Sequence, residues 1–386
     1  MTASAGSRSS RPNPVRAAPG ADGTAPDGVA GAEFRAEQRR GRGAVTNPPG
    51  RFETTARIGF DDGWGDDELP PLETTVTTER ARKILTRNDS PDIGFDRSLN
   101  PYRGCEHGCV YCFARPSHAF LGLSAGLDFE TKLFVKANAA EALERELSAP
   151  GYRPKVIAIG TNTDPYQPVE RRHRVTRQVL EVLDRANHPC GLVTKSALVL
   201  RDVDILARMA ARGLVRVAVS VTTLDRHLAR DMEPRAATPM RRLDTLRRLA
   251  EAGVPTGVLV APVIPALNDH ELEAILEAAH GAGARDAGYV LLRLPHELKD
   301  VFRAWLLERR PGRARHVLSV LRAMRDGKDY DSRWNARMTG TGPYARALGR
   351  RFELAVNRLG FNKERTKLRT DLFTPPRKGP EQLSLF

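Results

Sequence analysis

The stretch NPYRGCEHGCVYC, residues 100–112, holds three of the four cysteines of this 386-residue chain. Cys105, Cys109 and Cys112 are spaced C-x3-C-x2-C, directly after a short apolar run that is typical of a strand. A loop of this length can wrap around one iron–sulfur cluster. Three thiolates bind three irons of a [4Fe–4S] cluster, which leaves the fourth iron open to a substrate or cofactor. So few cysteines cannot form a disulfide scaffold, and they indicate a reducing, cytoplasmic compartment.

A structural zinc site is the alternative interpretation of this cluster, with His107 or His118 as the fourth ligand. Zinc sites seldom use this spacing without a second pair of ligands. The two histidines are therefore expected to position the loop through hydrogen bonds. Cys190, the fourth cysteine, begins an apolar run and fits a buried thiol that behaves as a small hydrophobe, with a hydrogen-atom donor as the alternative.

The region from residue 97 to residue 294 alternates short apolar runs with helix-period stretches, the pattern of consecutive βα units around a parallel sheet. This alternation predicts an α/β fold, an incomplete (β/α)6 TIM-like barrel. The six expected strands cover residues 98–102, 155–160, 191–194, 215–221, 255–261 and 288–292, and the expected helices cover residues 139–148, 170–187, 203–212, 239–252 and 269–282.

The flanking regions differ from the barrel in composition. Residues 1–50 are rich in Gly, Ala, Pro, Ser and Arg and are expected to be disordered. Residues 51–96 should pack on the barrel as a strand or short helix of unknown role. Residues 295–375 are expected to form an Arg-rich helical extension with helices near 297–309, 314–325 and 344–359, and residues 376–386 a flexible tail.

Charge is concentrated at the end of the chain. Residues 295–386 contain 21 Lys and Arg against 10 Asp and Glu, a net +11 out of the total of +14. Such an excess predicts contact with DNA phosphates, with a basic surface that has no partner as the alternative. The longest apolar runs are far shorter than the roughly 18 residues that a membrane span needs, so no membrane association is expected.

The cysteine motif resembles that of the radical S-adenosylmethionine (SAM) superfamily, in which an aromatic residue, here Tyr111, precedes the third cysteine. The resemblance covers about half of the chain. It implies a [4Fe–4S] cluster on Cys105, Cys109 and Cys112, with SAM bound to the open iron. Reductive cleavage of SAM then gives a 5′-deoxyadenosyl radical that abstracts hydrogen from the substrate, and a reductase such as flavodoxin or ferredoxin supplies the electron.

Cofactor contacts are expected just after the strands, because ligands of a parallel barrel bind at the carboxyl ends of its strands. Thr163 and Asp164 follow the second strand and would orient the amino group of SAM, unless Asp164 only caps an Asp-Pro turn. Lys195 and Ser196 follow the third strand. The lysine is well placed to pair with the methionyl carboxylate.

The fourth and fifth strands offer further contacts. Ser220 ends the fourth strand and would bind the carboxylate or ribose, with packing as the equal alternative. The fifth strand ends in APVIPALND, residues 261–269, which resembles the adenine-binding stretch of the superfamily. Val263 and Ile264 would lie against the base. The alternative is that the prolines only set the shape of the turn and the stretch binds no cofactor.

These motifs together look most like the spore photoproduct lyase-related, DNA-repair-photolyase-like branch of the superfamily. True spore photoproduct lyases carry a hydrogen-donating cysteine at the end of the second strand. This chain has Thr161, Asn162 and Thr163 there, so thymine-lesion reversal by the same route is in doubt unless Tyr166 or Cys190 substitutes. The branch therefore implies DNA repair without naming the substrate.

The chain ends in QLSLF, which matches the pentapeptide by which bacterial repair proteins bind the sliding DNA clamp. Gln382, Leu383, Leu385 and Phe386 would make the contacts, unless the tail folds back onto the body of the protein. The sequence thus predicts a radical SAM enzyme that acts on DNA. The alternatives are a radical enzyme for RNA, a peptide or a small molecule, and a non-catalytic iron–sulfur adaptor that binds DNA or the clamp.

Overall fold

The computed structural model describes residues 32–33, 36, 39–53, 71–364 and 367–376. The expected disorder of residues 1–31 and the clamp-like tail fall outside these residues. Within them, no helix is long and apolar enough to cross a membrane.

A seven-stranded sheet forms the centre of the fold, in the order β12-β11-β10-β9-β8-β5-β4. Strands β5 to β12 of this sheet run parallel, and β4 adds to the edge antiparallel to β5. All six predicted strands are present, and the sheet stays open between β12 and β4, which confirms the incomplete barrel. The strands are β4 (Leu85–Arg87), β5 (Arg97–Leu99), β8 (Ile157–Ile159), β9 (Cys190–Thr194), β10 (Val215–Ser220), β11 (Thr256–Val263) and β12 (Asp286–Leu291).

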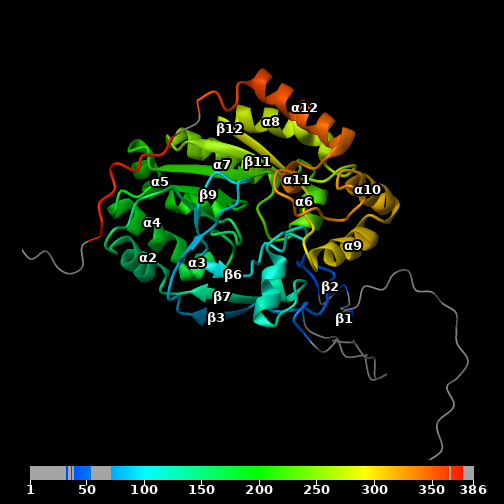
Figure 1. The fold of residues 1–386 in the computed structure, drawn as a ribbon, viewed down its shortest axis with the longest axis horizontal. Helices are drawn as coiled ribbons and strands as arrows, with labels where there is room; N and C mark the ends of the chain where they lie inside the picture. Colours follow the sequence, from blue (N-terminus) through cyan, green and yellow to red (C-terminus); the bar gives the residue numbers. More distant parts are fainter. Residues whose placement is uncertain (1–31, 34–35, 37–38, 54–70, 365–366, 377–386) are drawn as a thin grey trace, which may run out of the picture.

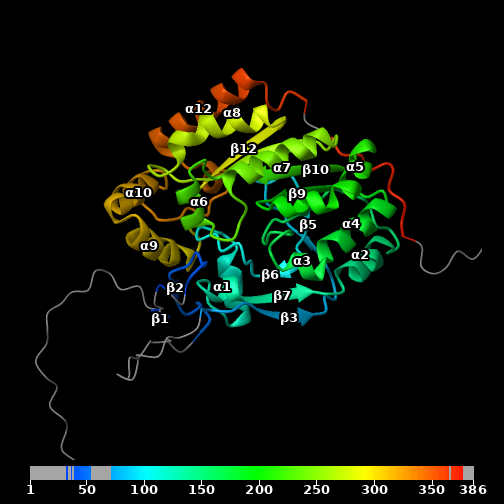
Figure 2. The same cartoon turned by 180° about the vertical axis from the view of Figure 1, so that it is seen from behind.

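Amphipathic helices cover the outer face of this sheet (Figures 1 and 2). Each buries an apolar stripe against the strands and leaves its charged side in water. These helices are α2 (Ala139–Leu147), α4 (Val175–Arg185), α5 (Val203–Ala211), α7 (Pro239–Glu251) and α8 (Leu272–Gly281). Their bounds match the predictions to within a few residues, except at residues 170–187.

The single helix predicted for residues 170–187 is wrong. The chain forms a short helix α3 (Glu170–His173) and then α4, because Arg174 between them adopts φ 52°. The Glu170 carboxylate accepts the Thr176 N–H, and the Thr176 hydroxyl donates to the Pro165 carbonyl. These bonds use local polar groups to fix the bend, which the helical period of the sequence does not reveal. Helix α6 (Arg226–Met232), capped by Asp225, was also not predicted.

A second sheet of three strands packs beside the barrel, in the order β3-β7-β6. It contains β3 (Thr75–Glu79), β6 (Tyr102–Arg103) and β7 (Lys132–Lys136). The strand predicted at residues 98–102 divides between the two sheets, because Pro101 has no N–H to donate to a ladder. β3 confirms a strand within residues 51–96.

The C-terminal region is helical as predicted. It contains α9 (Leu298–Arg309), α10 (Pro311–Ala323), α11 (Ala336–Thr339) and α12 (Gly342–Leu359), and α12 lies along α8 (Figure 1). The chain then runs back to the amino ends of the strands, where the Phe373 ring lies 5.5 Å from that of Tyr152. Most arginines of this region pair with carboxylates of the same chain, for example Arg337 with Asp92 and Arg351 with Glu273. The basic surface available to phosphates is therefore smaller than the count of charges suggests.

Residues 39–53, here called the N-terminal strap, are ordered, so the expectation of disorder up to residue 50 is wrong for this part. The backbone N–H groups of Gly43 and Ala44 donate to the Glu130 carboxylate at 2.9 and 2.8 Å. The Asn47 side chain bonds to Asp128 at 3.1 Å. The strap needs no hydrophobic period because it is held by hydrogen bonds to residues far along the chain, which composition cannot reveal.

Gly43 is the closest contact between the strap and the cysteine loop. A Cβ atom at this position would lie 1.7 Å from the Gly108 carbonyl oxygen, which is too close for any side chain. We predict that Gly43→Ala displaces the strap, lowers the midpoint of thermal unfolding and lowers the iron content after reconstitution. Gly94→Ala is the control, because nothing lies within 4 Å of its Cβ. Equal iron content in the two variants would contradict this role of the strap.

Candidate cluster and cofactor site

The cysteine loop follows β6, and its backbone is fixed by bonds to distant segments. The Cys105 N–H donates to the Phe129 carbonyl at 2.9 Å, and the Val110 N–H donates to the Met232 carbonyl at 3.0 Å. Gly104 and Gly108 adopt φ 75° and 67°, the left-handed region that favours glycine. Cys105 and Cys109 are buried, while Cys112 is partly exposed. The loop is therefore a preformed structure.

A buried ion pair lies under the loop. Arg115 and Glu130 are both fully buried and bond to each other. The Arg115 guanidinium also donates to the carbonyls of Gly108 and Cys109, and to those of Ala125 and Gly126. One arginine thus satisfies four backbone acceptors, and the carboxylate that balances its charge also holds the strap. Neither residue was predicted, because nothing in their local sequence distinguishes them from surface charges.

Asp164 is the second carboxylate that organises the site. One oxygen accepts the Thr194 hydroxyl at 2.7 Å, and the other accepts the Lys195 N–H at 2.7 Å and lies 3.3 Å from His107 Nδ1. Burial opposes the charged carboxylate, but His107 and these hydrogen bonds outweigh it and lower the pKa of Asp164 to about 2. Asp164 therefore fixes Lys195 and the cysteine loop, and His107 is the loop-positioning residue that was predicted.

The side chain of Lys195 lies close to Tyr111, a residue of the cysteine loop. Lys195 Nζ lies 5.7 Å from the centre of the Tyr111 ring. Burial raises the pKa of the Cys109 thiol, and the charge of Lys195 acts in the opposite direction. The structure thus brings together the strand-end lysine and the motif aromatic that the sequence singled out separately.

A chain of buried polar groups continues from Tyr111. Its hydroxyl lies 3.2 Å from Thr222 Oγ1, which donates to Glu233 at 2.6 Å. Glu233 in turn pairs with the buried Arg242. Ser220 is buried and donates to the Ala261 carbonyl at 3.0 Å. Glu233 and Arg242 were not predicted, because they belong to α6 and α7 regions without a recognisable motif.

The remaining predicted cofactor residues have structural partners. Thr163 donates to the Tyr102 carbonyl at 3.1 Å, and Ser196 accepts the Leu198 N–H at 3.2 Å. Val263 and Ile264 are buried in the hydrophobic core. The Ile264 N–H is bonded to Asn268 Oδ1 at 2.6 Å. Their roles toward SAM stay predictions.

The three cysteines are predicted to hold an iron–sulfur cluster. Burial raises the pKa of Cys105 and Cys109, so thiolates here need a cationic partner such as iron. Across the described ranges, no group of three His, Cys, Asp or Glu side chains is placed to hold a metal ion; this applies to the three cysteines as well as to the zinc alternative, and both ligand sets stay predictions. His118 bonds to the Lys132 carbonyl at 3.0 Å, as expected of a loop-positioning residue.

Cys190 lies at the wrong end of the sheet to react. It begins β9, whereas Thr194 ends that strand and borders the site. It is fully buried, and burial raises its pKa to about 12. The structure therefore favours the small core residue over the hydrogen-atom donor. Tyr166 is fully buried as well.

A family model described as the Radical SAM superfamily matches residues 99–279, which contain the cysteine loop and most of the parallel sheet. These residues form a radical SAM domain. Proteins of this superfamily use a [4Fe–4S] cluster and SAM, the cofactors that the cysteine loop predicts.

The chain is also similar in sequence to uncharacterized proteins and in fold to a solved structure. An uncharacterized protein of Mycobacterium tuberculosis is 38% identical over 221 residues, which cover 57% of this chain and 65% of that protein. One of Methanocaldococcus jannaschii is 27% identical over 192 residues, or 50% of this chain and 69% of that protein. The solved structure of a mutant spore photoproduct lyase matches with a TM-score of 0.51 at 16% identity, over 79% of this chain and 89% of that one. At this identity the likeness concerns the fold of the radical SAM domain and its surroundings.

The buried pair gives a quantitative prediction. Replacing Glu130 by Gln leaves Arg115 buried without a counter-charge, which typically costs about 3–5 kcal/mol. We expect a loss of this size in the free energy of unfolding in urea for Glu130→Gln. Glu141→Gln is the matched control, because Glu141 pairs with Arg80 on the surface and should change stability by about 1 kcal/mol or less. A similar small change in both variants would contradict the role of the Arg115–Glu130 pair.

Proposed function

We propose that the chain is a radical SAM enzyme that acts on DNA. The observation that carries the catalytic part is the meeting of Lys195 Nζ with Tyr111 of the cysteine loop, at 5.7 Å from the ring centre. A cluster adaptor has no need of a lysine beside the thiols, whereas a SAM enzyme needs a cation for the methionyl carboxylate. When bound, the cluster and SAM together supply a 5′-deoxyadenosyl radical.

Residues of the chain would bind the cluster and SAM and keep water away from them. Cys105, Cys109 and Cys112 would hold the cluster and leave one iron for SAM. The Asp164 carboxylate accepts the Lys195 N–H, which fixes the backbone of the lysine at the end of β9, the end of the strand that borders the cysteine loop. The buried groups around the loop exclude water, which strengthens each ionic contact at the site.

The charge of the chain supports DNA as the substrate. The net charge is +14, and exposed basic residues of the extension such as Arg315 and Arg346 have no acidic partner among the described residues. The fold likeness to spore photoproduct lyase agrees with a DNA substrate. Thr161 and Asn162 stand where the hydrogen-donating cysteine is expected, so we do not propose reversal of the same thymine lesion.

Cleavage of SAM tests the proposal directly. We predict that the reconstituted and reduced protein forms 5′-deoxyadenosine, that ultraviolet-damaged DNA raises the rate, and that Cys112→Ala abolishes it. Cys190→Ala is the control, since this cysteine lies at the opposite end of β9, and it should retain the rate. An unchanged rate in Cys112→Ala would refute the cluster assignment. A rate that DNA does not alter would leave RNA, a peptide or a small molecule as the substrate, and no cleavage at all would favour the adaptor.

Lys195 gives a second prediction. Lys195→Ala should raise the dissociation constant of SAM about tenfold or more, because a charged hydrogen bond to the carboxylate is lost. Isothermal titration of the reconstituted protein measures this change. Lys155→Ala is the control: Lys155 pairs with Asp96 and precedes β8 at the other end of the sheet. Equal affinities in the two variants would remove Lys195 from the SAM site.

The C-terminal QLSLF motif supports recruitment by the bacterial sliding clamp, with Gln382, Leu383, Leu385 and Phe386 as the contacts. A chain that ends at Glu381 should lose retention on immobilised clamp while its unfolding temperature and SAM cleavage stay unchanged. Equal retention of the full-length and shortened chains would remove this part of the proposal.

A further inference from the structure

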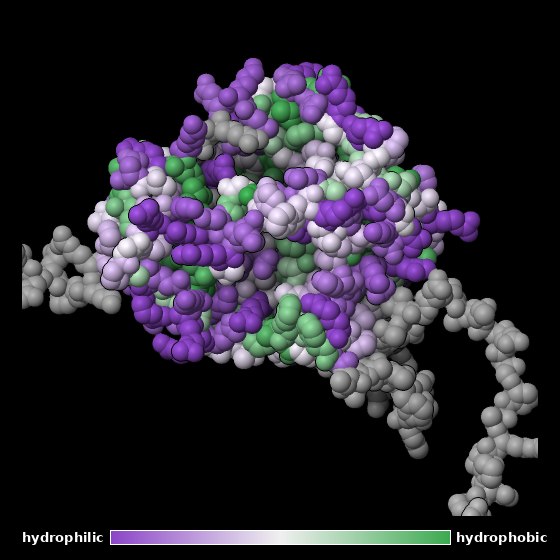
Figure 3. Space-filling view, viewed as in Figure 1, coloured by the Kyte–Doolittle hydropathy of each residue, from purple (hydrophilic) through white to green (hydrophobic). Residues whose placement is uncertain are grey.

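Exposed phenylalanines gather beside the cysteine loop. Three phenylalanine rings are exposed among the described residues: Phe52 at 57%, Phe113 at 42% and Phe120 at 71%. Phe113 directly follows Cys112, Phe120 lies in the 3-10 helix η1 (Arg115–Leu121), and Phe52 lies in the N-terminal strap. Figure 3 shows apolar side chains on this face over the position of η1. An aromatic ring in water is unfavourable, so exposed rings that lie against each other, as Phe52 and Phe120 do, indicate a binding surface.

Each of these rings already has an arginine against it. Arg51 Cζ lies 4.7 Å from the centre of the Phe52 ring and 5.1 Å from that of Phe120, and these two rings are 5.2 Å apart. Arg293 Cζ lies 4.8 Å from the centre of the Phe113 ring. We call Phe52, Phe120 and Arg51 the aromatic platform; Phe113 and Arg293 form a second exposed pair that directly follows the cysteine loop. Its rings are held in place before any ligand arrives.

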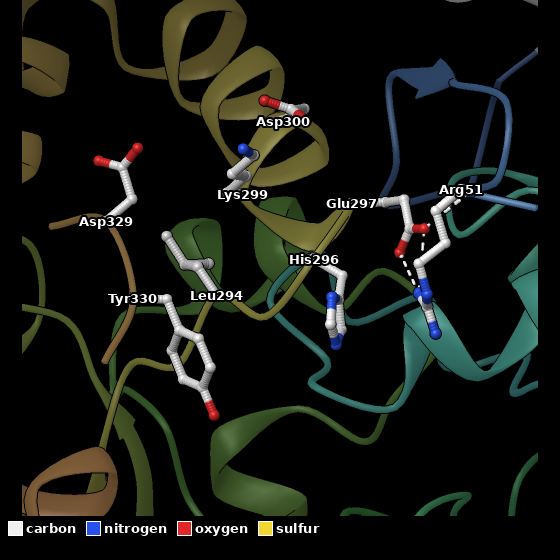
Figure 4. Close-up of a pocket in the computed structure, with 8 residues that line it drawn as sticks. All are labelled: Arg51, Leu294, His296, Glu297, Lys299, Asp300, Asp329 and Tyr330. Atoms are coloured by element: carbon white, nitrogen blue, oxygen red, sulfur yellow. Dashed lines mark hydrogen bonds and ion pairs between the residues drawn. The ribbon is translucent and has the colours of Figure 1, made fainter. Parts of the chain in front are cut away.

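The platform is attached to the cluster site. η1 begins with Arg115, whose Nε donates to the Cys109 carbonyl at 2.9 Å, so the helix that carries Phe120 also holds the cysteine loop. Beside the platform, an open cavity of about 500 Å³ is lined by Arg51 and by Leu294, the residue after Arg293. Figure 4 shows the His296 ring beside the Arg51–Glu297 ion pair and the Tyr330 ring on the opposite side of the cavity, next to Leu294. A ligand on the platform would therefore lie within reach of the radical site.

We propose that unpaired DNA bases stack on the aromatic platform. This inference rests on the proposed DNA substrate and identifies the form in which the enzyme takes it, as single-stranded or locally opened DNA. Rings paired with guanidinium groups suit bases, because both offer flat faces to a stacked base and neither requires a particular sequence. Lys299 and His296 at the edge of the cavity are exposed and could meet the phosphates that accompany the bases. A target base must leave the duplex before a radical can reach it, and stacking offsets that cost.

The test is the affinity for a labelled 12-nucleotide thymidine strand and for a duplex of the same length, measured by fluorescence anisotropy over a range of salt concentrations. We expect Phe120→Ala, alone and with Phe52→Ala, to weaken binding of the single strand by about five- to tenfold per ring. The salt dependence should stay the same, because no phosphate contact is removed. Phe120→Trp should restore the affinity. Met240→Ala is the control, since Met240 on α7 is exposed to the same 71% as Phe120 and should change nothing.

The outcomes separate this inference from the proposed function. If the wild type binds the strand and Phe120→Ala binds it equally well, the platform is not a base-stacking site, although DNA can still be the substrate. If the wild type binds no DNA while still cleaving SAM, both hypotheses are refuted: DNA as the substrate and base stacking on the aromatic platform. Self-association that Phe120→Ala abolishes without a change in DNA affinity would assign the surface to a second copy of the chain and overturn the inference.

Discussion

The Arg115–Glu130 ion pair is the interaction on which the site depends. Two full charges buried in a protein are unfavourable unless their geometry is well satisfied. Here the Arg115 guanidinium donates hydrogen bonds to the carbonyls of Gly108 and Cys109 in the cysteine loop and forms an ion pair with the Glu130 carboxylate. The carboxylate also accepts two N–H groups of the strap. Removing either charge would release the loop and the strap together, so the cluster ligands and the N-terminal segment form one structural unit.

The parallel sheet supplies the other half of the site. Its carboxyl ends bring Asp164, after β8, next to Thr194 and Lys195 at the end of β9. The same carboxylate reaches His107 in the cysteine loop. Asp164 therefore joins the barrel to the cysteine loop, and it also caps the Asp-Pro turn by accepting the Tyr166 N–H at 2.9 Å. Its contact with the amino group of SAM stays a prediction.

Regular features of the fold could be read from the sequence, because apolar periodicity and parallel-strand geometry determine them locally. The strands from β8 to β12, the helices around them and the cysteine spacing belong to this class. The strap, the split at Arg174 and the Arg115–Glu130 pair could not be predicted. Each depends on hydrogen bonds between residues far apart in the chain or on the backbone angle of one residue. Such features do not change the hydrophobic periodicity of the sequence. The position of Lys195 was predictable because the residue directly follows a strand, while its role toward SAM stays a prediction.

The central claim is that three cysteines on a rigid loop leave one iron of a [4Fe–4S] cluster open to SAM. Electron paramagnetic resonance of the reduced, reconstituted protein before and after addition of SAM tests it most directly. The account predicts a shift of the cluster signal when SAM is added to the wild type. A spectrum that is identical with and without saturating SAM would mean that the cofactor does not reach the cluster, and it would contradict the account.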